Sequence, residues 1–491
     1  MIKTILIQIT KQKDVRQNLS KLRQEIKLDN SKKELSDLLT NSPHELISCL
    51  DNPDAKTRKN AALLMGDLGL STFRSPLFDY YLKETHLFVK SAYLTALKSF
   101  DCSPFIPQLK EQIELLVHTP RTTDNNKHIE AEIRALSELI ILEEGTVTHT
   151  FTGFHKRFEC ILLTNRLHKS VTELQITKGL VQPFIAGLKV TTNDISELTA
   201  IRTYSELLFV IPSLETCVMD PIKAAKQLID SSLLSLLESI HLESAPFYFR
   251  IGIKSSMDLD TKSALTKKLS SEIQRLSNRK LLNSTSNYEI EIRLIENKLE
   301  EFNVLVKLFT IPDSRFDYRK ETIAASIKPV NAALLVELAK DYMMKDAQVL
   351  DPFCGVGTML IERQKVVKGN TSYGIDTFAE AIRKAKINTE AAGQIIHFVN
   401  KNCLEFTHEY SFDEIFTNMP FATGHKSQDE IYEIYEAFFP KANEWLVPGG
   451  TIIMYTHNRD YALLLAQKHG YKIIEEFEIM DKEGTYLLII K

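Results

Sequence analysis

The sequence predicts a multidomain α/β protein in which an all-helical part, a mixed α+β part and a doubly wound parallel sheet follow one another. The first 145 residues space their apolar side chains with a helical period. The middle of the chain places strand-like apolar runs beside helix-like segments. The last 146 residues alternate strands and helices, which is typical of a parallel sheet covered by helices on both faces. A chain of 491 residues is long enough for several hydrophobic cores.

Residues 1–145 are expected to form helical repeats. Residues 46–69 fit a helix, a turn at 52–54 and a second helix, and a related pattern recurs 32 residues later. Residues 128–139 belong to a third, weaker copy. The pattern is similar to HEAT repeats, which bury their apolar faces by stacking and present an extended surface. We therefore expect a protein or RNA partner for this part, with a plain helical bundle as the alternative fold.

The middle of the chain is predicted to hold two α+β units, at residues 146–243 and 244–311. Strands are expected at residues 159–164, 206–211, 247–253, 288–293 and 302–308, with a lysine-rich helix at 261–276. Residues 244–329 contain 15 Lys and Arg against 11 Asp and Glu, although the whole chain has a net charge of −4. The cations that lie close together are Lys254, Lys262, Lys267, Lys268, Arg275, Arg279 and Lys280. Such a stripe fits an RNA-facing surface, and a solvated helix face explains it equally well.

Residues 312–345 are interpreted as a connecting segment with a helix, and residues 346–491 as the doubly wound domain. The expected strands are residues 347–351, 372–376, 395–402, 413–417, 451–456, 471–480 and 485–491. The last two are separated by a short loop at residues 481–484 that has hairpin character. A parallel sheet that ends in an antiparallel hairpin distinguishes methyltransferase-like folds from most dinucleotide dehydrogenases.

Composition excludes several classes of protein. The six cysteines lie at least 49 positions apart, which argues against a disulfide framework and a structural zinc site, and no metal is expected. No run of eighteen apolar residues and no export signal is evident, so we expect a cytoplasmic protein. Because the charge of the whole chain is slightly negative, any contact with nucleic acid must come from a local patch.

A glycine motif, VLDPFCGVGT at residues 349–358, follows the first strand of the doubly wound domain. Gly355 and Gly357 allow a ligand to approach the backbone at the carboxyl end of this strand, although a tight structural turn needs glycines as well. Asp351 precedes them and suits a cationic ligand rather than a pyrophosphate. Asp376 ends the second strand 19 residues after Gly357, where a carboxylate can hold ribose hydroxyls or cap a helix.

A second motif, TNMPF at residues 417–421, follows the fourth strand. The Oδ1 atom of Asn418 and the carbonyl of Met419 can accept the two N–H bonds of a planar exocyclic amine, and Phe421 can stack on the ring that carries the amine. Taken singly, Asn418 also fits a turn and Phe421 a core. Together with the glycine motif, they favour transfer of a group to an amine.

With residues 315–320 (RFDYRK) and 325–329 (ASIKP), these motifs resemble the THUMP-domain class I RNA methyltransferases that make N2-methylguanosine. The resemblance covers about residues 150–491 and implies a ferredoxin-like unit at 146–243 and a THUMP-like unit at 244–311. It also implies S-adenosylmethionine as the cofactor and structured RNA as the substrate, tRNA rather than rRNA. The helical part in front lies outside the usual plan of this family.

The resemblance also implies roles for individual residues. Asp376 would bind the cofactor's ribose, and Asn402 its adenine. The implied cofactor-binding residues are Asp351, Cys354, Gly355, Gly357, Thr358, Asp376, Asn402 and Cys403. The implied catalytic residues, which form the acceptor site, are Asn418, Pro420 and Phe421. Three alternatives stay open: N2-methylation of rRNA, N6-methylation of adenine in nucleic acid, and a non-catalytic protein that binds RNA.

Overall fold

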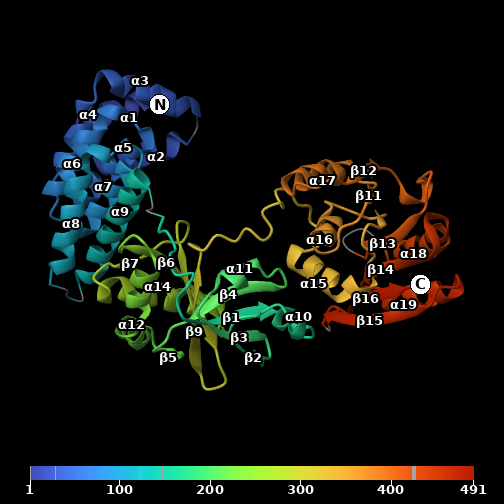
Figure 1. Ribbon diagram of the computed structural model, residues 1–491. Helices are drawn as coiled ribbons and strands as arrows, with labels where there is room; N and C mark the ends of the chain where they lie inside the picture. The colour runs from blue at the N-terminus through green and yellow to red at the C-terminus, as the bar shows by residue number, and fades with distance from the viewer. Residues whose placement is uncertain are drawn as a thin grey trace. The chain divides into compact units, whose positions relative to one another are not determined.

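The computed structural model is shown in Figure 1. It describes residues 2–27, 29–120, 122, 124–145, 148–422, 427–480 and 482–491. The chain forms two compact units, each described by itself: unit 1 comprises Met1–Thr148 and Lys267–Asn287, and unit 2 comprises His149–Thr266 and Tyr288–Lys491. In the described part of the chain, no helix combines the length and the apolar composition needed to cross a membrane.

Unit 1 is built mainly of helices, as the sequence predicts for residues 1–145. The α-helices are α1 (Ile2–Thr10), α2 (Val15–Glu25), α3 (Asp29–Asn41), α4 (His44–Ile47), α5 (Ala55–Leu68), α6 (Arg74–Lys83), α7 (Leu87–Leu97), α8 (Ile106–His118) and α9 (Asn126–Glu144). The carboxylate of Asp54 accepts the N–H groups of Lys56 and Thr57 and so caps α5, at the end of the predicted turn. Alternate helices pack together, α5 on α7 and α7 on α9. Their assignment to HEAT repeats stays a prediction.

Unit 2 carries two β-sheets, the first formed by the middle of the chain. Its strands are β1 (Phe158–Thr164), β2 (Leu180–Phe184), β3 (Gly187–Thr192), β4 (Tyr204–Val210), β5 (Thr216–Val218), β6 (Phe247–Lys254), β8 (Ile290–Glu296) and β9 (Glu301–Leu308). The order is β2-β3-β1-β4-β9-β8-β6, with β5 beside β9. The five expected strands are present, and β2, β3 and β5 are additional. Because β4 pairs with β9, one sheet joins strands from both predicted units.

Helices accompany the first sheet. They are α10 (Lys169–Glu173), α11 (Ser196–Ala200), α12 (Pro221–Asp230), α13 (Leu233–Ile240) and α14 (Leu259–Leu276). Helix α14 spans the division between the units, and the short strand β7 (Leu281–Asn283) belongs to unit 1.

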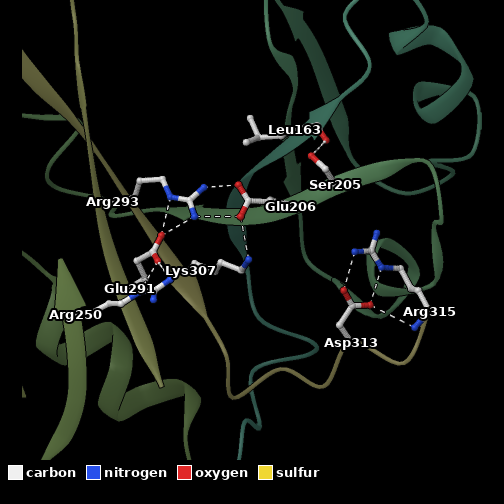
Figure 2. A network of polar contacts seen from close by, with 9 residues as sticks. All are labelled: Leu163, Ser205, Glu206, Arg250, Glu291, Arg293, Lys307, Asp313 and Arg315. Carbon is white, nitrogen blue, oxygen red and sulfur yellow. Dashed lines mark hydrogen bonds and ion pairs between the residues drawn. The ribbon is translucent and has the colours of Figure 1, made fainter. Parts of the chain in front are cut away.

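A charge network links the strands of the first sheet (Figure 2). Glu206 on β4 accepts hydrogen bonds from Arg293 on β8 and from Lys307 on β9, the latter at 2.9 Å between Nζ and Oε1. The carboxylate of Glu291 on β8 accepts hydrogen bonds from Arg293 and from Arg250 on β6. Burial acts to raise the pKa of Glu206, but the bonds from Arg293 and Lys307 outweigh it and lower this pKa to about 2. The three cations of this network, Arg250, Arg293 and Lys307, are therefore matched by carboxylates.

Some cations of the predicted stripe, on and after α14, also form ion pairs or hydrogen bonds within the chain. Within unit 1, Lys268 and Arg275 both pair with Glu272, at 3.2 and 2.8 Å. The guanidinium of Arg279 donates to the hydroxyl of Ser137 at 2.5 Å. Lys268, Arg275 and Arg279 thus have partners in the folded chain, which reduces the free positive charge of this stripe.

The second sheet confirms the doubly wound prediction. Its strands are β10 (Gln348–Asp351), β11 (Thr371–Asp376), β12 (His397–Asn400), β13 (Phe412–Asn418), β14 (Leu446–Thr456), β15 (Ile473–Met480) and β16 (Thr485–Ile490). They lie in the order β12-β11-β10-β13-β14-β16-β15. The first five run parallel, and β16 is antiparallel to both β14 and β15. The closing antiparallel pair is therefore present, although Asp481 in its predicted loop lies outside the described residues.

Helices cover both faces of this sheet. They are α15 (Pro329–Ala339), α16 (Thr358–Val366), α17 (Ala379–Ala391), α18 (Gln428–Trp445) and α19 (Arg459–Lys468). Successive side chains of a strand point to opposite faces. Accordingly, Val349 joins the core that contains residues of α15 and α16, and Leu350 joins the core that contains residues of α18 and α19. Strand β10 is therefore buried on both faces.

Candidate active site

The glycine motif forms the turn between β10 and α16. Gly355 has φ +52°, and an added Cβ there would meet no atom within 4 Å. Gly357 has φ +80°, and an added Cβ would lie 3.1 Å from the ring of Phe398. A positive φ favours glycine at both positions. The N–H of Cys354 donates to the carbonyl of Ile375 on β11 at 2.9 Å, which fixes the turn beside the second strand.

Asp376 connects the ends of the first two strands. Its Oδ2 accepts the N–H of Gly355 at 2.9 Å, and its Oδ1 accepts the N–H of Phe378 at 2.8 Å. The carboxylate therefore holds the glycine turn in place. Because each carboxylate oxygen can accept a second hydrogen bond and the side chain is half-buried, Asp376 can also bind ligand hydroxyls.

Asp351 lies fully buried at the end of β10. Its Oδ1 accepts the hydroxyl of Thr417 at 2.6 Å and the N–H of Phe353 at 3.1 Å, while Oδ2 has no partner among the described residues. Burial raises the pKa of Asp351 to about 7. The hydroxyl oxygen of Thr358 is likewise buried and finds no partner in the described part of the chain. Buried polar atoms without partners are rare, so a polar ligand is the natural complement of this region.

A pocket of about 630 Å³ opens at the carboxyl ends of these strands. The predicted site residues in its wall are Cys354, Gly355, Thr358, Asp376, Asn402, Cys403, Asn418, Pro420 and Phe421. Asp351 and Gly357 are not in the wall: Asp351 lies buried behind it, and Gly357 is the N-cap residue of α16. The structure therefore brings together predicted residues from four different strand ends.

The acceptor side of the pocket follows β13. The Oδ1 atom of Asn418 is buried, and no described residue donates a hydrogen bond to it. The N–H of Met419 donates to the carbonyl of Tyr455 on β14 at 2.9 Å, and the Met419 side chain is fully buried. These contacts hold the backbone next to Asn418 and leave its amide oxygen able to accept an N–H group.

The remaining predicted residues differ in chemistry. Burial raises the pKa of the Cys403 thiol to about 11, and that of Cys354 well above its usual value. Both thiols are therefore protonated near neutral pH and unsuited to nucleophilic attack. The Oδ1 atom of Asn402 accepts the N–H of Leu404 at 3.1 Å, which leaves the NH2 group of its amide as a donor for a ligand.

Part of the pocket wall was not assigned from the sequence. It comprises Ile323, Ala325, Ser326, Ile327, Met359, Phe378, Lys401, Leu404 and Ile434, among others. The ASIKP segment could have been found from the sequence, because it was one of the motifs that carry the family resemblance, although no role was assigned to it. The RFDYRK segment lies elsewhere: Arg315 donates to the carbonyls of Ile201 and Tyr204, and Tyr318 donates to Glu362 at 2.6 Å.

Comparison with known proteins agrees with this geometry. Residues 317–484 match a family described as RMKL-like, methyltransferase domain. Among solved structures, TrmN from Thermus thermophilus is similar, with a TM-score of 0.52, 19% identity and coverage of 68% of this chain and 99% of that one. A putative methyltransferase complexed with SAH has a TM-score of 0.52, 13% identity and coverage of 68% and 98%. A predicted N6-adenine-specific DNA methylase from Listeria monocytogenes has a TM-score of 0.50, 17% identity and coverage of 68% and 96%.

These identities establish the fold and leave about a third of this chain without a counterpart in each of the three structures. The family match adds the chemistry, and the buried oxygens of Asp351 and Thr358 fit a polar, cationic cofactor. Residues 317–484 are therefore a class I methyltransferase domain that uses S-adenosylmethionine as its cofactor.

Proposed function

We propose that the protein forms N2-methylguanosine in RNA, with tRNA as the substrate. The observation that carries this proposal is Asn418, whose buried Oδ1 atom accepts no hydrogen bond from the described residues and lies in the same pocket as the glycine turn. An acceptor oxygen in that position suits the N–H group of an exocyclic amine. Phe421, in the same wall, supplies an aromatic face for the base.

The proposed mechanism depends mainly on positioning. The cofactor supplies a methyl group on a cationic sulfur, already activated for transfer. Asn418 Oδ1 and the Met419 carbonyl accept the two N–H bonds of the guanine amine, which draws its lone pair out of conjugation and orients it. No strong general base is required, because the methylated amine is acidic enough to release its proton to water. The protonated thiols of Cys354 and Cys403 take no part.

RNA is proposed to contact more than the catalytic domain. We retain residues 146–243 as a ferredoxin-like unit and 244–311 as a THUMP-like unit. Because many cations there are paired with carboxylates, we also assign RNA contacts to the helical unit. A groove of about 710 Å³ in unit 1 is lined by polar side chains such as Gln17 and Asn60. The cations in or next to its lining segments are Lys13, Arg16, Lys56 and Lys59. Arg16 interacts electrostatically with Asp54, and none of the other three forms an ion pair with a described residue.

Salt dependence tests this assignment. Replacing these four cations with Gln should flatten the dependence of tRNA binding on salt, by somewhat less than one unit of log–log slope for each lost phosphate contact. A comparison variant replaces Lys268 and Arg275, which are already paired with Glu272, and should change the slope less for each cation removed. An unchanged slope in the first variant would instead favour a protein partner for the helical unit.

The main alternative is N6-methylation of adenine, because the same amide and aromatic ring hold an adenine amine equally well. One similar structure is named as a predicted N6-adenine-specific DNA methylase. A non-catalytic RNA-binding protein is the second alternative. Transfer of a labelled methyl group to tRNA, rRNA and DNA separates these cases. We expect transfer to tRNA, and we propose a cytoplasmic location. Transfer to DNA or rRNA alone, or none despite cofactor binding, would overturn the proposal.

A further inference from the structure

His457 lies against the proposed acceptor site and was not singled out from the sequence. It directly follows β14, which pairs in parallel with β13 so that Asn418 lies opposite Tyr455. The imidazole of His457 stacks on the ring of Phe421, with ring centroids 3.9 Å apart and planes inclined by 18°. Both side chains are half-buried. Tyr455 meets the same imidazole edge-on at 5.9 Å.

The stack restricts how Phe421 can be used. An aromatic ring has two faces, and His457 covers one of them. Phe421 is in the wall of the 630 Å³ pocket, whereas His457 is not among the described residues that line it. A planar ligand can therefore stack on Phe421 only from the face opposite His457.

The backbone around His457 is fixed by more contacts than the backbone around Phe421. Phe421 lies outside any helix or strand, in the segment that follows β13. On the other side, the hydroxyl oxygen of Thr456 accepts the N–H of Asn458 at 2.8 Å and lies 2.7 Å from the hydroxyl of Tyr435. The turn that carries His457 is thus fixed by β14 and by α18. The fixed imidazole can serve as the surface against which the Phe421 ring is set.

We propose that His457 is a positioning residue of the acceptor site: its imidazole sets the plane of the Phe421 ring so that the target base stacks on the opposite face. The identity of the base rests on the proposed function, and the stack itself does not. Burial lowers the pKa of His457, so the ring is uncharged near neutral pH and stacks as a neutral aromatic group.

Substitutions that keep or remove the aromatic ring test this role. His457→Phe keeps a ring against Phe421, whereas His457→Leu keeps apolar bulk without one. Beyond the effect of its buried area, an aromatic pair favours the stacked arrangement by a factor of about two to ten in the equilibrium constant. We therefore expect His457→Leu to lower the single-turnover methylation rate of a tRNA transcript by about two- to tenfold, with unchanged affinity for S-adenosylmethionine. His457→Phe should remain within about twofold of the wild-type rate.

A matched control is available in the same domain. His397 stacks on Tyr373, with centroids 4.9 Å apart and planes inclined by 28°, but it is exposed and outside the wall of the pocket. His397→Leu removes a similar stack and should leave the methylation rate unchanged. A wild-type rate in His457→Leu, or an equal loss in His457→Phe, would overturn the positioning role.

A second readout does not depend on activity. In protein labelled at the phenylalanine rings, the ring current of His457 should shift the signals of Phe421, and His457→Leu should remove this shift. His397→Leu should preserve it. If no RNA is methylated but the shift behaves as stated, the proposed function fails while the stack stands. If the shift is the same in wild type and His457→Leu, the proposal for His457 fails by itself.

Discussion

The pH dependence of cofactor binding should follow the ionisation of Asp351. This carboxyl is fully buried, has one oxygen without a partner among the described residues, and has a pKa raised to about 7 from the ordinary 3.8. A cationic cofactor binds the ionised form better than the neutral one. With a pKa of about 7, the ionised fraction rises from roughly a tenth at pH 6 to a half at pH 7. Affinity for S-adenosylmethionine should therefore rise about fivefold over this interval.

The same shift has a consequence for stability. Below the unfolded pKa of 3.8, Asp351 is protonated in both states and contributes no pH dependence. Between 3.8 and about 7 the unfolded chain releases the proton while the folded chain retains it, so the free energy of unfolding falls as pH rises. A shift of about three pKa units corresponds to about 4 kcal/mol. This contribution to the pH dependence should vanish in Asp351→Asn.

Calorimetric titration with S-adenosylmethionine at pH 6 and 7, with wild type and Asp351→Asn, tests the statement on affinity. Denaturation of both proteins between pH 4 and 7 tests the statement on stability. The variant is a close match, since its Oδ1 atom can still accept the bonds from Thr417 and Phe353. It should bind more weakly than wild type at pH 7, and its affinity should not follow the fivefold rise. Equal affinities at pH 7, or the same rise in both proteins, would refute the role of Asp351 as a charge behind the pocket wall that favours a cationic ligand.

Three further substitutions are informative. Asn418→Ala should lower the single-turnover rate by at least about a hundredfold, because it removes an orienting contact to the reacting amine, and should leave cofactor affinity within a few fold; a change in KM alone would contradict this. Asp376→Asn should weaken S-adenosylmethionine binding by about 1–3 kcal/mol in calorimetry, since it removes charge-assisted bonds. We choose Asn rather than Ala because Asn keeps one oxygen that can accept the N–H of Gly355, whereas Ala removes both acceptors that hold the turn. Glu206→Gln should lower the free energy of unfolding at pH 7 by about 1–3 kcal/mol. The stability from this ion pair is present above pH 4.5 and lost as pH falls towards 2, so denaturation curves of the two proteins should converge there.

The second sheet could be predicted from the sequence largely because its strands are buried. A strand such as β10, covered on both faces, appears as a continuous apolar run between turn residues. The middle of the chain was harder. Strand β2 exposes Leu180 and Phe184, so its side chains do not follow a buried-strand pattern, and it was not anticipated. Local patterns predict strands well when burial fixes their composition.

Some residues of the candidate site could likewise be predicted from the sequence, and others could not. Asn418, Gly355 and Asp376 were found because parallel strands bring their carboxyl ends to one edge of the sheet, so short motifs after each strand meet in space. The wall from Ile323 to Ile327 and the stack of His457 on Phe421 arise from contacts between segments far apart in the sequence. No local pattern encodes such contacts. The placement of Asp351 behind the wall likewise depends on the packing around it.

The proposed function requires that the domain methylate a guanine amine held by Asn418. The most direct measurement incubates unmodified tRNA with the full chain and S-adenosylmethionine carrying an isotopically labelled methyl group, digests the tRNA to nucleosides and identifies the labelled product by mass spectrometry. We expect labelled N2-methylguanosine with wild type and little or none with Asn418→Ala. Labelled N6-methyladenosine, or equal labelling by both proteins, would contradict it.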